Sequence, residues 1–180
     1  MTAQVDPLLQ VWETRAGAHP IERALALLAA VWPERDEQSW AQTSIGARDA
    51  YLLTLRETLF GATLETTTRC PSCGEQLESS FSTTDIRMPP DAATAGLHFG
   101  AQGYDIRFRV PNSADVLAVS GAPTDAAALA LLQRCTLAIR RFGDAIEVAQ
   151  LPPEIAAELG LRMAAADPGA DIRIGRHCPA

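Results

Sequence analysis

Apolar residues recur at helical spacing in two stretches of the N-terminal third. In HPIERALALLAAVW, Leu25, Leu28 and Trp32 fall on one face, and Pro20 suits the first turn of a helix. In TSIGARDAYLLTLRETLFG, leucine and tyrosine recur with the same period until Gly61, a residue type that commonly ends a helix. The pattern predicts two amphipathic helices before residue 62.

After residue 61, the pattern repeats at every second position instead of at helical spacing. In ATLETTTRCPSCGEQLESSF, alternating positions carry Leu64 before the cysteines and Leu77 after them, with polar residues between. Alternation on both sides of a short turn is typical of two antiparallel strands. We therefore predict a β-hairpin over residues 62–87, with Cys70 and Cys73 at its tip.

A stretch rich in proline, alanine and glycine follows the hairpin and predicts a loop over residues 88–103. YDIRFRV then alternates as a strand does, with Ile106 and Phe108 on one face. Arg107 and Arg109 would share the opposite face. We interpret these arginines, like the pair at 140 and 141, as a solvated face, although such pairs also bind phosphate or carboxylate.

The remainder of the chain has the spacing of helices. TDAAALALLQRCTLAIRRFG reads as a single helix in which Cys135 and Ile139 share an apolar stripe, and NSADVLAV reads as a shorter helix before it. A further helix is expected over residues 153–166. A short strand is expected over 170–176, leading to Cys178.

These elements indicate an α+β fold, with a mainly helical body and a small zinc-ribbon-like element made of the hairpin and the C-terminal strand. We expect one compact domain. Its segments are an N-terminal helical segment (1–61), the C-x-x-C hairpin (62–87), a loop (88–103), a strand followed by helices (104–168) and a strand leading to a second Cys-Pro element (169–180).

Composition and charge narrow the classes of function. The chain has 180 residues and a formal net charge of -7, and all fifteen basic residues are arginine. This sign disfavours a protein that gains affinity from nucleic-acid phosphates. The sequence has no long apolar run, and its N-terminus lacks the order of a signal peptide, so we expect a cytoplasmic protein without membrane contact.

The cysteines carry the strongest chemical signal. In a cytoplasmic chain, a C-x-x-C pair is more often a metal or redox motif than a disulfide. Cys70, Cys73 and Gly74 have the spacing of one half of a zinc ribbon, and RHCPA around Cys178 repeats that half up to its last spacer. We therefore predict structural zinc bound by these three cysteines. The alternative is a redox pair, but such pairs usually begin a helix rather than join two strands.

Zinc of this kind takes four ligands, and the fourth is not evident. A cysteine at position 181 would complete the pattern, so we expect the fourth ligand to be absent from this chain. His177 is a candidate for its place, although adjacent residues seldom both reach one metal without strain. Cys135 lies in an apolar stripe and is expected to be a buried packing residue.

Catalytic motifs are not found. The chain has no nucleotide-binding glycine loop, no G-x-S-x-G and no H-E-x-x-H. Glu75, the carboxylate nearest to the cysteines, is better explained as a polar hairpin residue than as a general base. We therefore expect a protein that is not an enzyme. Trp12 and Trp40 are candidates for a partner interface, whereas Trp32 continues a helical stripe.

At this point the sequence resembles a known family. SIGARDAYLLTLRETLFGATLETTTRCPSCGEQLESSFSTTDI, with IRFRVPNSADVLAV and a late HCPA, is similar to the T4-type baseplate hub assembly chaperones of tailed phages and related contractile injection systems. The most specific part runs from Gly46 to Glu75. The family pattern continues through a second Cys-Gly into an aromatic-rich helical tail, which this sequence lacks.

The resemblance implies an accessory protein that helps the baseplate hub assemble, with Cys70, Cys73 and Cys178 as zinc ligands and hub proteins as partners. Two other functions stay open. A zinc-ribbon adaptor that binds nucleic acid or another protein is consistent with the cysteines. The negative net charge argues against nucleic acid as its partner. A C-x-x-C thiol oxidoreductase fits the pair but not its strand context.

Overall fold

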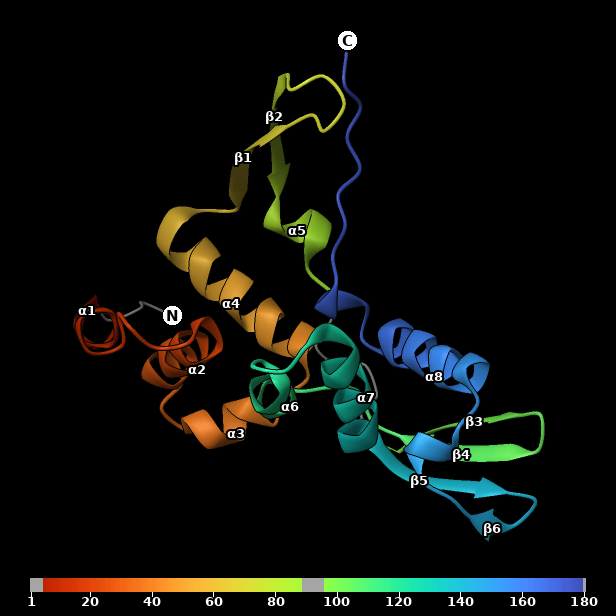
Figure 1. Ribbon diagram of the computed structural model, residues 1–180. Coiled ribbons are helices and arrows are strands. Elements are labelled where there is room, and N and C mark those ends of the chain that lie inside the picture. Colours follow the sequence, from red (N-terminus) through yellow and green to blue (C-terminus); the bar gives the residue numbers. More distant parts are fainter. Residues whose placement is uncertain (1–4, 89–95, 180) are drawn as a thin grey trace.

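The computed structural model describes residues 5–88 and 96–179. It combines helices with two small antiparallel sheets, as the α+β expectation required. The first sheet is a hairpin that projects from the helical body, and the second lies at the other end of the molecule (Figure 1).

Four helices form the N-terminal part, and they are α1 (Val5–Thr14), α2 (Pro20–Val31), α3 (Glu37–Ala41) and α4 (Ile45–Phe60). Helices α2 and α4 confirm the two predicted amphipathic helices. The small core between them is aromatic: the ring centroids of Trp40 and Tyr51 lie 4.8 Å apart. Trp40 is only 1% exposed, so its expected role at an interface is wrong, whereas Trp12 is 78% exposed.

The predicted hairpin is confirmed. Strands β1 (Thr63–Arg69) and β2 (Gln76–Ser82) pair in register from Thr63 opposite Ser82 to Arg69 opposite Gln76. The short helix α5 (Thr83–Ile86) follows β2. Glu57 of α4 anchors this base of the hairpin, because its carboxylate accepts hydrogen bonds from Thr83 and Arg87.

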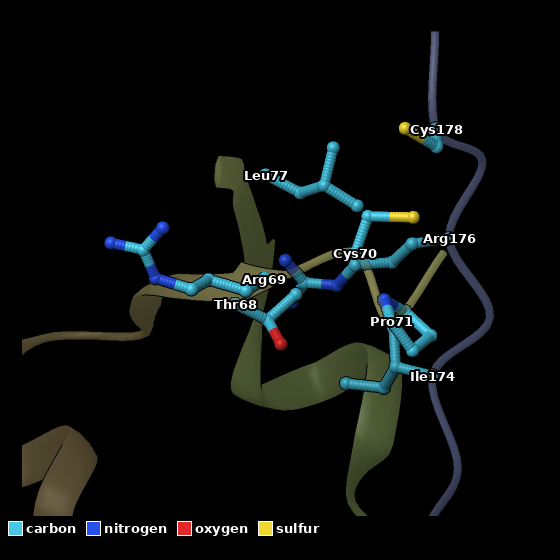
Figure 2. Close-up of a pocket in the computed structure, with 8 residues that line it drawn as sticks. All are labelled: Thr68, Arg69, Cys70, Pro71, Leu77, Ile174, Arg176 and Cys178. Atoms are coloured by element: carbon cyan, nitrogen blue, oxygen red, sulfur yellow. The ribbon is translucent and has the colours of Figure 1, made fainter. Parts of the chain in front are cut away.

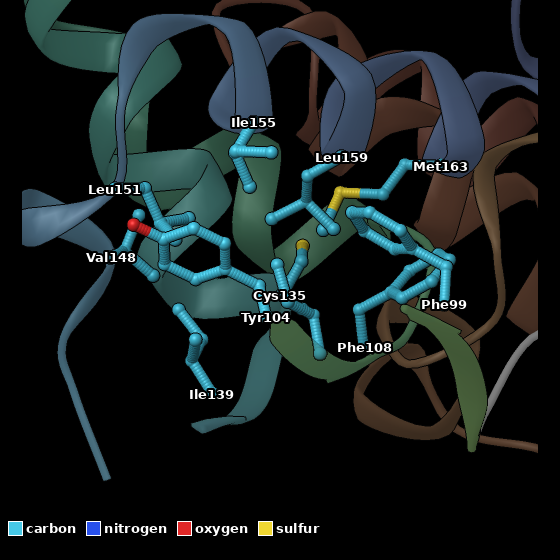
Figure 3. Packing of buried hydrophobic residues seen from close by; sticks show 11 residues of the cluster. Phe99, Tyr104, Phe108, Cys135, Ile139, Val148, Leu151, Ile155, Leu159 and Met163 are labelled. Carbon is cyan, nitrogen blue, oxygen red and sulfur yellow. The ribbon is translucent and has the colours of Figure 1, made fainter. Parts of the chain in front are cut away.

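The second sheet has the order β3-β4-β5-β6. Its strands are β3 (Leu97–Ala101), β4 (Tyr104–Phe108), β5 (Thr136–Arg141) and β6 (Asp144–Ala145). Helices α6 (Ser113–Val119) and α7 (Thr124–Cys135) connect β4 to β5, and α8 (Pro153–Ala166) covers the inner face of the sheet. Figure 3 shows Leu159 and Met163 of α8 packed on Phe99 and Phe108.

Three expectations about local structure need correction. Residues 136–141 form strand β5 rather than the end of a helix. The four-residue spacing of the buried Cys135 and Ile139 fits both a helix and a strand, and hydrogen bonding to β4 favours the strand. Strand β3 lies inside the predicted loop 88–103, of which residues 89–95 fall outside the described residues. Residues 171–179 run beside the hairpin without forming the predicted strand (Figure 1).

The pair formed by Arg107 on β4 and Arg109, which follows the strand, also differs from expectation. Arg107 is exposed, whereas Arg109 is half-buried by its contacts with α6 and α7. The guanidinium of Arg109 donates to the carboxylate of Asp115, with 2.9 Å between Nη2 and Oδ1. Arg134 donates to the same carboxylate, which is 1% exposed. A buried charge of this kind needs such partners, so Arg109 is a structural residue.

The start of α4 joins distant parts of the chain. The backbone N–H of Gly46 donates to the carboxylate of Asp167 at 2.9 Å, and Arg48 donates to Ser113 of α6. A Cβ atom at position 46 would lie 2.2 Å from Oδ1 of Asp167 and 2.9 Å from Cα of Gly169. Glycine is therefore required there by close packing, which gives the distinctive GARD stretch a structural role.

Candidate metal centre

The turn of the hairpin folds back on itself around two cysteines. The backbone N–H of Cys70 donates to the carbonyl of Glu75 at 2.8 Å, and that of Gly74 donates to the carbonyl of Cys70 at 2.9 Å. Gly74 has φ of 77°, a left-handed conformation that glycine adopts without a steric cost. The sequence C-P-S-C-G thus builds a tight loop that holds both side chains on one side.

Three sulfur atoms from two distant segments meet at this turn. The Sγ atoms of Cys70, Cys73 and Cys178 all lie within 4.8 Å of one another, and those of Cys73 and Cys178 are 3.5 Å apart. Two thiolates on one tetrahedral zinc ion, each with a bond of about 2.3 Å, are separated by about 3.8 Å. The three cysteines therefore have the spacing of one face of a zinc tetrahedron.

The hydrogen bonds at the turn favour a thiolate at Cys70. The backbone N–H groups of Cys73 and Ser72, followed by the Cys73 side chain, lower the pKa of Cys70 to about 7. The usual value is near 9, and the deprotonated form is the one that binds metal. At neutral pH the Cys70 sulfur is thus poised to act as a ligand.

The extended C-terminal segment directs every second side chain toward the hairpin, and Cys178 is one of them. Ile174, Arg176 and Cys178 face the hairpin across a cavity of about 360 Å³ (Figure 2). Arg176 donates to the hydroxyl of Thr66 on β1, which ties the segment to the hairpin. Arg69 donates to the carbonyl of Gly74 at 3.4 Å. The first contact holds the C-terminal segment against β1, and the second lies within the hairpin turn.

The structure sorts the candidate residues of the sequence. Cys70, Cys73 and Cys178 come together, while His177 is exposed and is not in the cluster of ligand atoms found among residues 5–88 and 96–179. Cys135 lies elsewhere, 0% exposed, and burial, followed by the charge of Asp115, raises its pKa to about 12. It is a packing residue, as predicted. The C-x-x-C pair joins two strands and does not begin a helix.

Arg176 is the residue at this site that was missed in the sequence. Its signal was the alternation of Ile174, Arg176 and Cys178, which places all three on one side of an extended segment. The contact with Thr66 depends on a separation of 110 residues, which no local pattern reports.

Comparison with known proteins adds the family. The fold is that of an α+β protein with a cysteine-bearing hairpin, and none of the helices in the described ranges has the length and apolarity to cross a membrane. The family model described as T4 bacteriophage base plate protein matches residues 7–159, so the chain belongs to that family. The match includes Cys70 and Cys73 and ends before Cys178. No curated protein and no solved structure matches the chain.

Proposed function

We propose that this baseplate protein is a non-enzymatic assembly factor for the hub of a phage or contractile-injection-system baseplate. In this proposal, Zn²⁺ held by Cys70, Cys73 and Cys178 fixes the hairpin in the shape that the hub recognises. Membership of the base plate protein family supports a role among baseplate proteins. The chaperone role and the hub as its partner are the finer steps of the proposal.

The observation that carries the zinc site of this proposal is the convergence of the three sulfur atoms, while the baseplate role rests on the family. Cys73 and Cys178 are separated by 105 residues, yet their sulfur atoms lie 3.5 Å apart. The strands that present this site bury none of their side chains, since β1 and β2 have only exposed and half-buried residues. An isolated two-stranded hairpin is marginal in water. A cross-link between the turn and the C-terminal segment therefore supplies what packing does not.

Each residue has a part in holding the ion. The amides of Ser72 and Cys73 favour the thiolate of Cys70, and Gly74 allows the turn that orients both sulfur atoms. Arg176 positions the C-terminal segment against Thr66 so that Cys178 reaches the turn. Bound zinc would cross-link the turn and the C-terminal segment without redox chemistry, with the three cysteines as three of its four ligands. Metal binding to such a site contributes directly to folding free energy.

The surroundings of the site support a structural rather than a catalytic ion. A catalytic zinc has a general acid or base beside it. Within the part of the chain that the structure describes, the cluster of possible ligand atoms consists of cysteines alone. The factor would act in the cytoplasm of the producing cell, where thiols stay reduced.

Co-purification with hub proteins tests the assembly role. The tagged chain is co-expressed with each baseplate protein of the same genome, and complexes are isolated by size-exclusion chromatography. We expect a stable complex with at least one hub protein. Absence of any complex, with the chain folded and zinc-loaded, would contradict the proposal.

Metal analysis of cysteine variants tests the site itself. We expect one zinc per chain in the unaltered protein and loss of that zinc in Cys70→Ser and Cys73→Ser. Cys135→Ala is the matched control, because it removes a cysteine that lies outside the cluster. Retention of zinc in Cys73→Ser, or its loss in Cys135→Ala, would place the metal elsewhere.

A thiol oxidoreductase is the second candidate, and the pKa of Cys70 near 7 is the observation that favours it. Reduction of insulin disulfides by the purified chain would support it. We expect no such activity, because the pair lies on a hairpin turn and because bound zinc would occupy the thiolates.

A further inference from the structure

The β3-β6 sheet has one buried and one exposed face. Its inner face packs on α8, whereas Arg107 of β4 and Arg140 of β5 are exposed on the other side. Arg107 is opposite Ala138, two residues from Arg140, so the two arginines are diagonal neighbours across the strands. No ion pair engages either of them within residues 5–88 and 96–179. Asp105, opposite Arg140, is held by His98 at 2.6 Å.

Arg107 and Arg140 are neighbouring arginines that, within the described residues, have neither an ion pair nor a side-chain hydrogen bond; Arg23 on α2 is the other arginine of this kind. The sequence has 22 acidic and 15 basic residues. Seven of the arginines in the described ranges form ion pairs with carboxylates: Arg15, Arg48, Arg87, Arg109, Arg134, Arg162 and Arg173. Five others donate to backbone or hydroxyl oxygens or lie over an aromatic ring: Arg35, Arg56, Arg69, Arg141 and Arg176. Arg107 and Arg140 are thus positive charges left available on a protein that is otherwise acidic.

An exposed aromatic ring lies at the end of the same sheet. Phe142, in the turn between β5 and β6, is 81% exposed and has φ of 49°. This left-handed conformation is strained for a bulky side chain. The ring covers Gly103 of the neighbouring turn, where a Cβ atom would lie 2.5 Å from it, and the Arg141 guanidinium lies 5.7 Å from the ring centroid. The ring is therefore held in place although it buries little surface.

We propose that Arg107, Arg140 and Phe142 form a docking surface for an acidic protein surface on a baseplate partner, an inference that rests on the proposed function. Arginine and aromatic residues are the types enriched among residues that dominate binding energy. The arginines would pair with carboxylates of the partner, and Phe142 would enter an apolar pocket beside them. This surface lies at the opposite end of the molecule from the cysteine site (Figure 1), so the two would make separate contacts.

A protein partner fits this surface better than nucleic acid. Asp105 lies on β4 opposite Arg140, and Asp144 lies on the neighbouring strand β6, so the positive charge of this face is limited to two side chains. Two arginines can pair with two carboxylates but neutralise little of the continuous row of phosphates that a nucleic acid presents. A single ring at a turn also offers one apolar anchor rather than the series of stacking platforms that single-stranded nucleic acid uses.

The test measures binding of the full chain to each purified baseplate protein of the same genome, and to a duplex DNA oligonucleotide, at low and high ionic strength. Arg140→Glu reverses one charge, and Arg23→Glu is its control, since Arg23 is exposed on α2. Phe142→Asn removes the ring while placing in the turn a residue that tolerates left-handed backbone. We expect Arg140→Glu and Phe142→Asn each to weaken binding by about tenfold or more.

We expect Arg23→Glu to bind like the unaltered chain, and Phe142→Asn to unfold at the same or a higher temperature, which excludes misfolding as the cause of weaker binding. Undiminished binding of both variants to a partner that the unaltered chain binds would overturn the docking surface and leave the proposed function standing. If no baseplate protein binds the unaltered chain, both proposals fall. Binding to the DNA that Arg140→Glu weakens would assign the surface to nucleic acid and overturn the inference.

Discussion

The sheet-bearing body and the projecting hairpin are held together in different ways. In the body, Ile106, Cys135 and Leu159 are fully buried and belong to one apolar cluster. In the hairpin, no residue of β1 or β2 is buried, and its contacts to the C-terminal segment include one side-chain hydrogen bond and a group of sulfur atoms. Burial of apolar side chains thus holds the body together, whereas the hairpin depends on specific polar contacts and on the cluster of three cysteines.

The largest expected effect comes from the core of the body. Leu159→Ala removes a side chain that is 0% exposed between α8 and the sheet, and we expect the free energy of unfolding to fall by about 2 to 5 kcal/mol. Leu161→Ala, on the same helix but 66% exposed, should change it by less than about 0.5 kcal/mol. Denaturant titration measures both. Equal losses would mean that α8 does not pack as described.

The next effect is at the joint between α4 and Asp167. Gly46→Ala places a methyl group 2.2 Å from Oδ1 of Asp167 and should destabilise the protein by about 1 to 3 kcal/mol. Gly160→Ala is the control, because a Cβ atom meets nothing within 4 Å at that helical position. It should stabilise the protein by about 0.5 to 1 kcal/mol. The melting temperature of Gly46→Ala should therefore be lower than that of Gly160→Ala, and the opposite order would contradict the prediction.

Metal removal should act on the hairpin and spare the body. After chelation of zinc, we expect faster amide exchange in β1, β2 and the C-terminal segment, because the cross-link between the turn and Cys178 is lost. Amides of β4 and α8 should keep their protection, since apolar burial holds them. Hydrogen exchange with mass spectrometry resolves the two regions. A uniform loss of protection would contradict the division.

The smallest expected effect is a dependence on pH. Zinc binding requires the thiolate of Cys70, whose pKa is about 7, so apparent zinc affinity should fall as pH decreases through 7. Above pH 7 Cys70 is already deprotonated, so its contribution to the pH dependence of zinc affinity should level off. Competition with a chromogenic chelator across pH 5 to 9 measures this. A flat profile would exclude Cys70 as a ligand.

The sequence predicts the parts whose signal is local. The helical period around Leu25 and Leu28 and the alternation on both sides of Cys70 correctly give α2 and the hairpin. Cys178 could be assigned to the cysteine cluster from the sequence because its Cys-Pro motif repeats the one in the hairpin. The structure brings it there on an extended segment rather than on the predicted strand.

Other features depend on pairing between distant residues, which local patterns do not report. Ile139 satisfies both a helical and a strand period, and only the pairing with Ile106 on β4 selects the strand. Gly46 looks like an ordinary helical glycine until Asp167 is placed against it. Trp40, treated as an interface candidate, is buried because Trp32 and Tyr51 enclose it.

X-ray absorption at the zinc edge tests the central claim most directly. The zinc-loaded chain should give at least three sulfur neighbours at about 2.3 Å, and Cys73→Ser should lose one of them or lose the metal. A zinc shell made of nitrogen and oxygen alone, or a chain that takes up no zinc, would contradict the proposal that Cys70, Cys73 and Cys178 bind one ion.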